Sequence, residues 1–181
     1  MLQLKIPDTE LFDEKEQKFI RIKGCTLSLE HSLVSISKWE SKYKKPFLSR
    51  DGKTAEETLD YIRFMTITQN VDPMMYGLLT REHIQQVMDY IDDPMTATTI
   101  SRKEGQGSSR SIITSEVIYY YMTAYQIPFD PCQKWHLNRL MMLIRVCDEK
   151  NAPKKKMGKK DAASRYSSIN AARRAKHHTR G

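Results

Sequence analysis

Polar and apolar residues alternate near the start of the chain. The segments LQLKI (2–6) and KFIRI (18–22) alternate residue by residue, and CTLSLE (25–30) continues the pattern. A period of two places every second side chain on one face, which is typical of strands with one buried side. We expect a small antiparallel sheet or hairpin here. The acidic segment DTELFDEKE (8–16) is expected to be a surface turn.

A helical period begins after residue 31. The segment HSLVSISKWESKYKK has apolar residues three or four positions apart, which predicts a helix that ends before Pro46. Thr54 and Glu57 have the spacing of a capping box, in which each side chain accepts a hydrogen bond from a free backbone N–H. The helix that they open is expected to run to about Asn70. The apolar positions of the two helices are Leu33, Ile36, Trp39, Tyr43, Leu59, Ile62, Phe64 and Met65.

Two more helical segments are expected before residue 95. Asp72 followed by Pro73 starts a short one, because an acceptor side chain precedes a proline in the first turn. Thr80 can cap a longer helix, which ends at Asp93-Pro94. The apolar positions of the longer helix are Ile84, Val87, Met88 and Ile91.

The next segment separates these helices from the most apolar part of the chain. MTATTI (95–100) is predicted to be a short strand. SRKEGQGSSR (101–110) has no apolar residue and contains two glycines, so we predict a flexible, charged loop. Loops of this kind inside a compact domain often carry function.

The stretch from Ser111 to Lys150 is the most apolar and aromatic part of the chain. It divides at Ile127, because a residue before proline is pushed out of helical geometry. Asp130 followed by Pro131 is again a helix start. We therefore expect two helices joined by a short loop, an αα-hairpin at the centre of the fold. Their apolar positions are Val117, Tyr120, Tyr121, Ala124 and Tyr125 in the first helix, and Trp135, Leu137, Leu140, Met141, Leu143, Ile144 and Cys147 in the second.

The apolar positions of the second helix cover more than half of its circumference. So broad a face is the centre of a core or an assembly interface. The polar residues that fall between these positions are His136, Asn138, Arg139 and Arg145. The candidate partner-binding residues are Trp135, Leu137, Leu140, Met141 and Ile144.

Charge divides the chain into two parts. Residues 150–181 hold eleven Lys and Arg residues against one acid, a net charge of +10, whereas residues 1–149 carry a net charge of −2. We predict a globular domain over residues 1–150 and a basic tail over residues 151–181. The tail has too little apolar surface to fold alone, so we expect it to be disordered, or helical only against a partner. Its candidate contact residues are Lys154, Lys155, Lys156, Lys159, Lys160, Arg173 and Arg174.

The size and composition of the chain fit one α+β domain, with a small N-terminal β-element followed by a helical bundle. No apolar run approaches the roughly 20 residues that a membrane-spanning helix needs. The N-terminus lacks the basic and apolar pattern of a signal peptide. The three cysteines are widely spaced and odd in number, which favours reduced thiols in a cytoplasm.

The sequence has no recognisable catalytic or metal-binding motif. Gly105 and Gly107 lack the Lys-Ser/Thr pair and the helix that follow a phosphate-binding loop. Cys132 and His136 lie four residues apart, the spacing of two ligands on one helix face. A closed metal site needs four ligands, so packed core cysteines are the better interpretation. We expect no enzymatic activity, no metal and no cofactor.

Three interpretations of the basic tail remain open. It can bind a nucleic-acid backbone with salt-sensitive affinity and without sequence specificity. It can dock on an acidic protein surface, or it can be a solvated end. Tyr166 is its only aromatic residue for base stacking, which disfavours sequence-specific RNA recognition.

Several stretches together resemble small proteins from the tail-morphogenesis region of tailed bacteriophages, most specifically tail assembly chaperones. These are HSLVSISKWESKYKKPFL (31–48), DPMTATTI (93–100), ITSEVIYYYMTAYQIPF with CQKWHLNRLMMLIRVC (113–147), and RYSSINAARRAKHHTRG (165–181). The resemblance covers most of the chain. No catalytic or ligand motif defines the family, so no active-site residue carries over.

The resemblance implies a non-enzymatic protein of the host cytoplasm that binds the tape measure protein and keeps it soluble while tail tube subunits assemble around it. The implied partners are therefore proteins, and the oligomeric state, a homo-oligomer included, stays open. Two alternatives remain. One is a structural tail or head-completion component of the virion, and the other is a small nucleic-acid-binding protein that uses its basic tail.

Overall fold

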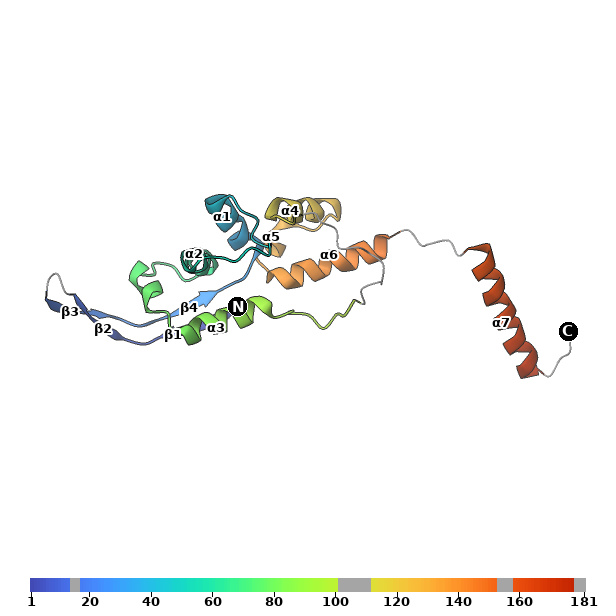
Figure 1. Cartoon of the computed structure of the whole chain (residues 1–181), viewed down its shortest axis with the longest axis horizontal. Coiled ribbons are helices and arrows are strands. Elements are labelled where there is room, and N and C mark those ends of the chain that lie inside the picture. The colour runs from blue at the N-terminus through green and yellow to red at the C-terminus, as the bar shows by residue number, and fades with distance from the viewer. Residues whose placement is uncertain (14–16, 101–111, 153–157, 178–181) are drawn as a thin grey trace. The chain divides into compact units, whose positions relative to one another are not determined.

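The computed structural model of this chain describes residues 1–13, 17–100, 112–152 and 158–177. It has an N-terminal set of antiparallel strands followed by helices, an α+β fold as predicted (Figure 1). Contacts divide it into two compact units, Met1–Asp148 and Glu149–Gly181.

The strands are β1 (Leu2–Ile6), β2 (Thr9–Asp13), β3 (Lys18–Ile22) and β4 (Cys25–Leu29). The helices that begin in the first unit are α1 (Leu33–Tyr43), α2 (Ala55–Met65), the 3₁₀ helix η1 (Pro73–Leu78), α3 (Arg81–Asp92), α4 (Ser115–Ala124), α5 (Phe129–Cys132) and α6 (Leu137–Asn151), the last of which ends three residues into the second unit. The helix of the second unit is α7 (Lys159–His177).

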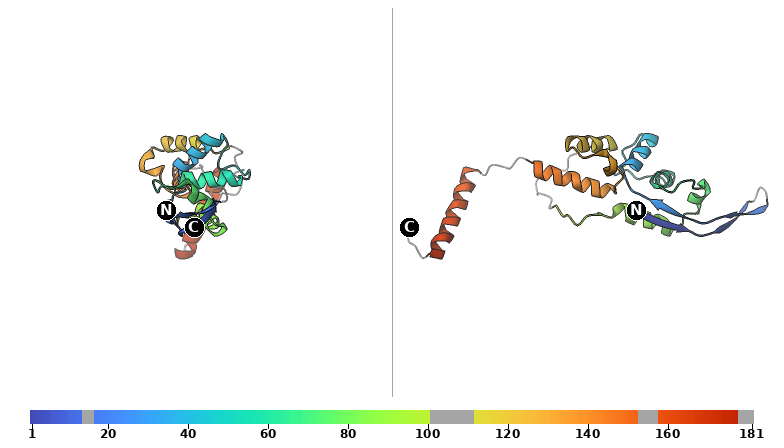
Figure 2. Two further views of the ribbon diagram at one scale, coloured as in Figure 1. Left: turned by 90° about the vertical axis from the view of Figure 1, so that its left-hand side faces the viewer. Right: turned by 180° about the vertical axis from the view of Figure 1, so that it is seen from behind.

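The strands pair as two successive segments of one antiparallel ribbon, β1 with β4 and β2 with β3. The β2–β3 end of the ribbon projects beyond the helices, as Figure 2 shows from behind. At the junction the Gly24 N–H donates to Asp8 Oδ1 at 2.7 Å. A Cβ on residue 24 would lie 2.3 Å from the Ile6 carbonyl oxygen, so only glycine fits this corner.

The interpretation of residues 8–16 as a surface turn was wrong for its middle part, because Thr9–Asp13 forms strand β2. The acidic residues Glu10 and Asp13 flank the apolar pair Leu11-Phe12, and this acidic composition favoured the turn interpretation. The strand conformation of this segment comes from pairing with β3, in which Phe12 lies opposite Phe19 with the ring centroids 5.1 Å apart. Residues 14–16 lie outside the described part of the chain.

The first helices begin where the sequence predicts. Thr54 and Glu57 form the predicted capping box at the start of α2, Thr80 caps α3, and Asp72 caps η1. The α2 helix ends at Met65, however, and not near Asn70. After Met65 the backbone becomes extended and bonds to the segment that follows β4, with Glu30 N–H donating to Met65 O at 2.9 Å.

Of two other predicted segments, one has a different structure from the predicted one, and the other lies outside the residues that the structure describes. Residues 95–100 form no strand; the Thr98 N–H instead donates to its neighbour Thr96 Oγ1 at 3.1 Å. Threonine side chains that bond nearby backbone groups compete with strand pairing in this way. The predicted loop at 101–110 lies outside the described residues.

Helices form on both sides of Ile127, but with different boundaries from those predicted. Asp130 and Pro131 fall within the short helix α5, and α6 begins only at Leu137. Asp130 has φ −98° and ψ 127°, which is not helical. The chain turns at residues 133–135, and His136 then forms an isolated β-bridge with Ser32 immediately before α6 starts.

The buried face of α4 also differs from the predicted one. Ile118 and Met122 are fully buried, whereas Tyr120 is exposed and Tyr121 is only partly covered. Large aromatic residues gave this segment its apolar character, but the core takes the narrower aliphatic face. The largest fully buried side chains of the core are Trp39, Leu4, Leu27, Leu29, Leu33, Ile36, Ile62, Met65, Ile118, Met122, Leu137 and Leu140.

Truncation of α6 at its most buried position tests this core. Leu140 is fully buried, so Leu140→Ala is expected to lower the free energy of unfolding by about 2–5 kcal/mol through lost burial and a cavity. Arg145→Ala, at an exposed position of the same helix, is the control and should change it by less than about 0.5 kcal/mol. Denaturant titration of both variants measures the difference, and equal midpoints would exclude this face from the core.

Removal of residues 151–181 tests the division into two units. The truncated chain is expected to keep the thermal midpoint and the near-ultraviolet circular dichroism of the full chain, because the core residues lie before residue 149. A large cooperative loss of stability would mean that the C-terminal unit is part of the folded body.

Candidate functional site

The predicted partner-binding residues lie mainly inside the protein. Leu137, Leu140 and Ile144 are buried in the core, and Trp135 and Met141 are partly buried against it. Trp135 precedes α6, and its ring lies 4.4 Å from the Arg139 guanidinium carbon. Of the two interpretations of this face, core and assembly interface, the structure places its centre in the core.

The predicted basic contact residues fall into three groups. Arg173 and Arg174 are exposed on α7, and Lys159 and Lys160 belong to its first turn. Residues 154–156 lie outside the described part of the chain.

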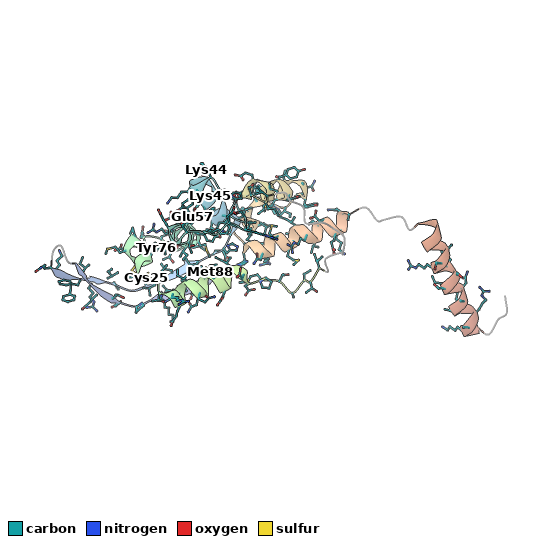
Figure 3. All side chains as sticks on the ribbon, in the orientation of Figure 1. Cys25, Lys44, Lys45, Glu57, Tyr76 and Met88 are labelled. Carbon is teal, nitrogen blue, oxygen red and sulfur yellow. The ribbon has the colours of Figure 1, made fainter. Side chains whose placement is uncertain are left out.

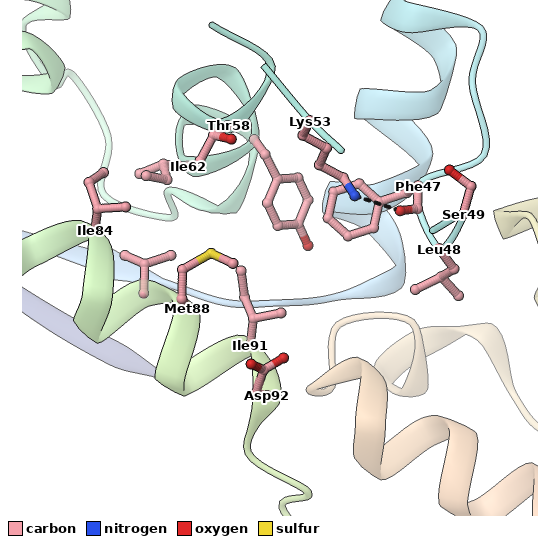
Figure 4. A pocket seen from close by; sticks show the side chains of 12 residues that line it. Phe47, Leu48, Ser49, Lys53, Thr58, Ile62, Ile84, Met88, Ile91 and Asp92 are labelled. Carbon is pink, nitrogen blue, oxygen red and sulfur yellow. Dashed lines mark hydrogen bonds between the residues drawn. The ribbon is translucent and has the colours of Figure 1, made fainter. Parts of the chain in front are cut away.

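An apolar groove lies between α2, α3 and the α1–α2 loop, and we call it the α2–α3 groove. Its volume is about 420 Å³. Figure 4 shows the side chains of both helices and of the loop converging on it. Its apolar lining consists of Phe47, Leu48, Tyr61, Ile62, Ile84, Val87, Met88 and Ile91. Its polar lining consists of Ser49, Lys53, Thr58 and Asp92.

The loop wall of the groove is held by a buried carboxylate. After α1 the chain reverses at Lys44, which has φ 55°, and Phe47 returns against the core. Glu40 Oε1 accepts from the Phe47 N–H at 2.8 Å, and its Oε2 accepts from the Ser115 N–H at the start of α4 at 2.8 Å. Charge-assisted bonds of this kind are stronger than neutral ones, so Glu40 fixes both the loop and α4.

Lys53 closes one end of the groove. Its Nζ donates to the Phe47 carbonyl oxygen at 2.8 Å, as the dashed line in Figure 4 marks. The ammonium also lies 4.2 Å from the centre of the Phe47 ring. Burial lowers the pKa of Lys53, while the charge of Glu57 acts in the opposite direction. Asp92, on α3, places a carboxylate in the lining as well.

Two acidic residues of α2 hold it against α1 and the loop that follows α1. Lys45 donates to Glu57 Oε1 at 2.7 Å, and Figure 3 labels both residues in the helical part of the body. Asp60 accepts hydrogen bonds from Tyr43 at 2.6 Å and from Lys42. The bond with Lys42 is the main reason that the pKa of Asp60 lies below its ordinary value. These contacts set the position of the α2 wall.

A buried polar cluster lies beneath the groove. Tyr61 lines the groove, and its hydroxyl lies 2.5 Å from His31 Nδ1. The His31 and His136 rings meet edge to face with centroids 5.1 Å apart, and His136 Nε2 donates to Tyr90 O at 2.9 Å. The Tyr90 hydroxyl in turn donates to Glu30 Oε1 at 2.7 Å. His31 is only 2% exposed, so this cluster lies within the core.

Metal binding gains no support from the geometry. Within the described ranges, no three His, Cys, Asp or Glu side chains gather where they could hold a metal ion. Cys132 ends α5 and His136 precedes α6, so the two residues do not share the helix face that their spacing indicated. Across the described helices, none combines the length and apolar character needed to cross a membrane.

The apolar residues that line the groove are visible in the sequence, but their pattern indicates only that they are candidates for the core. The α3 positions Ile84, Met88 and Ile91 were recognised as an apolar stripe, and Phe47-Leu48 is an apolar pair in a loop between two helices. In the structure Met88 remains 42% exposed, and Leu48 is also exposed. The sequence pattern shows that such residues are apolar, but only the packing shows which of them the core leaves uncovered.

Comparison with protein-family models, curated protein sequences and solved structures finds no match to this chain.

The His31 cluster generates a test of stability against pH. Burial, with the neighbouring His136 as a second cause, lowers the pKa of His31 from 6.5 to about 3. Between these values the unfolded chain binds a proton that the folded chain does not. The free energy of unfolding should therefore fall as pH falls below 6.5, at most by about 1.4 kcal/mol per pH unit for this residue.

The variant His31→Gln isolates this contribution, because glutamine can hydrogen-bond the Tyr61 hydroxyl without titrating. Urea denaturation at about pH 7.5 and about pH 5.5 compares the two proteins largely above the range in which carboxylates titrate. The variant is expected to lose less stability between these two pH values than the wild type does. Equal losses would show that His31 does not contribute to the acid sensitivity.

Proposed function

We propose that the chain is a non-enzymatic assembly chaperone of a tailed bacteriophage, which holds an amphipathic helix of the tape measure protein in the α2–α3 groove. The observation that carries the proposal is the apolar lining of this groove, whose floor is buried and whose edge leaves Met88 and Leu48 exposed. An amphipathic helix inserts side chains three and four positions apart into a groove of this kind.

The chemistry of the groove suits a helical client. Methionine is flexible and polarisable, so Met88 can adapt to different apolar side chains along a long, repetitive partner. Lys53 and Asp92 add one positive and one negative group to the apolar lining. Such a lining favours a helix with apolar anchors flanked by charges of both signs. A chaperone also needs reversible binding, which a shallow groove provides better than a large obligate interface does.

The identity of the client follows from the resemblance of the sequence to tail assembly chaperones. On this proposal the protein acts in the host cytoplasm and leaves before the virion is complete. The structural alternative differs in one measurable respect, since a tail or head-completion component stays in the finished particle. Mass spectrometry of purified virions distinguishes the two, and a stoichiometric amount of this chain in the particle would refute the chaperone.

A charged residue in the groove should abolish client binding. Met88→Asp is expected to weaken binding of the tape measure protein by at least about thirtyfold, the size of a strong interface residue. The measurement is the amount of the phage's own tape measure protein that stays soluble and co-purifies when the two chains are co-expressed, with washing at about 0.5 M salt. Apolar contacts should withstand this salt concentration, whereas exposed ionic contacts are screened.

Met74→Asp is the matched control. Met74 is 47% exposed on η1 and is not part of the groove lining, so the same chemical change should leave co-purification intact. Thermal melting of both variants checks that each is folded. If Met88→Asp retains the tape measure protein as well as Met74→Asp does, the groove is not the client site.

A further inference from the structure

The helix of the second unit presents a continuous basic surface. α7 spans 19 residues, and its side chains from residue 163 to residue 176 are exposed. No Asp or Glu occurs in this stretch, so the helix carries no acid there to neutralise its basic residues. The basic residues of the stretch are Arg165, Arg173, Arg174 and Lys176.

These charges lie on two opposite sides of the helix. Successive residues turn by about 100° and rise by about 1.5 Å, so Arg165, Arg173 and Lys176 lie within about 80° of one another around the axis. Arg165 and Lys176 are about 16 Å apart along the axis, and Arg174 lies on the opposite side. A helix that docks on a flat acidic protein surface needs its charges on one side. Charges on opposite sides fit a partner that has negative groups on two walls.

The other residues of this stretch are suited to close approach. Seven have short side chains: Ala163, Ser164, Ser167, Ser168, Ala171, Ala172 and Ala175. The only large apolar residues are Tyr166 and Ile169, which are too few to anchor the helix in an apolar protein groove over several turns. The serines and Asn170 can donate hydrogen bonds to phosphate oxygens.

We propose that α7 binds duplex DNA without sequence preference, lying in the major groove with its Arg and Lys side chains on the phosphates of both walls. The major groove of B-form DNA admits an α-helix, whereas that of A-form RNA is deep and narrow. A helix of this length extends about 28 Å, which matches about 8 base pairs. This activity is separate from the α2–α3 groove, and neither depends on the other.

Fluorescence anisotropy of the full chain with a labelled duplex of about 24 base pairs tests the proposal. If four phosphates are contacted, affinity should fall by about a hundredfold between about 50 and about 200 mM salt. Changing Arg165, Arg173, Arg174 and Lys176 together to Gln should remove most of this salt dependence. The control changes four exposed basic residues of the first unit to Gln: Lys5, Lys23, Arg81 and Arg145.

The control has the same net charge as the α7 variant. Equal effects of the two variants would therefore show that the total charge of the protein drives binding, and not α7.

The variant Ala172→Pro keeps every charge but breaks the α7 helix, and it should weaken duplex binding by at least about tenfold. Unchanged binding would overturn docking in the groove. A polyglutamate competitor at equal charge concentration should not displace the duplex; efficient displacement would assign α7 to an acidic protein instead. Co-purification of the tape measure protein should be unaffected by the α7 changes.

Discussion

Residues 30–32, which directly follow β4, form the junction on which the packing of the first unit depends. Glu30 N–H bonds to Met65 O at the end of α2, and His31 O accepts from the Leu137 N–H at the start of α6 at 2.7 Å. Ser32 then caps α1 and forms the bridge to His136. Backbone groups this deeply buried must find partners, so one segment fixes the ends of three helices. The buried His31 and Tyr61 side chains complete this junction.

The α2–α3 groove follows from the same arrangement. Trp39, on α1, donates from its indole nitrogen to Glu57 O at 2.9 Å, and the Glu57 and Asp60 carboxylates hold α2 against α1. Charged contacts at the rim keep the two helices in register, while the α3 side of α2 is left to apolar packing. That packing covers Val87 but not Met88, and the groove is the space that remains.

The two units of the chain use different physical interactions. The first is held by apolar burial, which salt does not screen, and its proposed client site is also apolar. The exposed stretch of α7 has few large apolar residues and a dense positive charge, so its proposed interaction with DNA weakens with salt. On these two proposals, one protein would hold a helical client through a surface that salt does not screen and DNA through a surface that salt does screen.

Local sequence patterns determined most of the elements. The alternation of β1, β3 and β4, the capping box of α2 and the helical period of α1 depend on neighbouring residues, and each was predicted from them. Long-range pairing decided what these patterns lacked: β2 forms against β3, α2 stops where its end bonds to Glu30, and α6 starts only after His136 has bridged to Ser32. The groove could not be predicted from the sequence either, because apolar character identifies only which residues are candidates for burial. Which of them remain exposed depends on how α2, α3 and the loop at Phe47 meet in space.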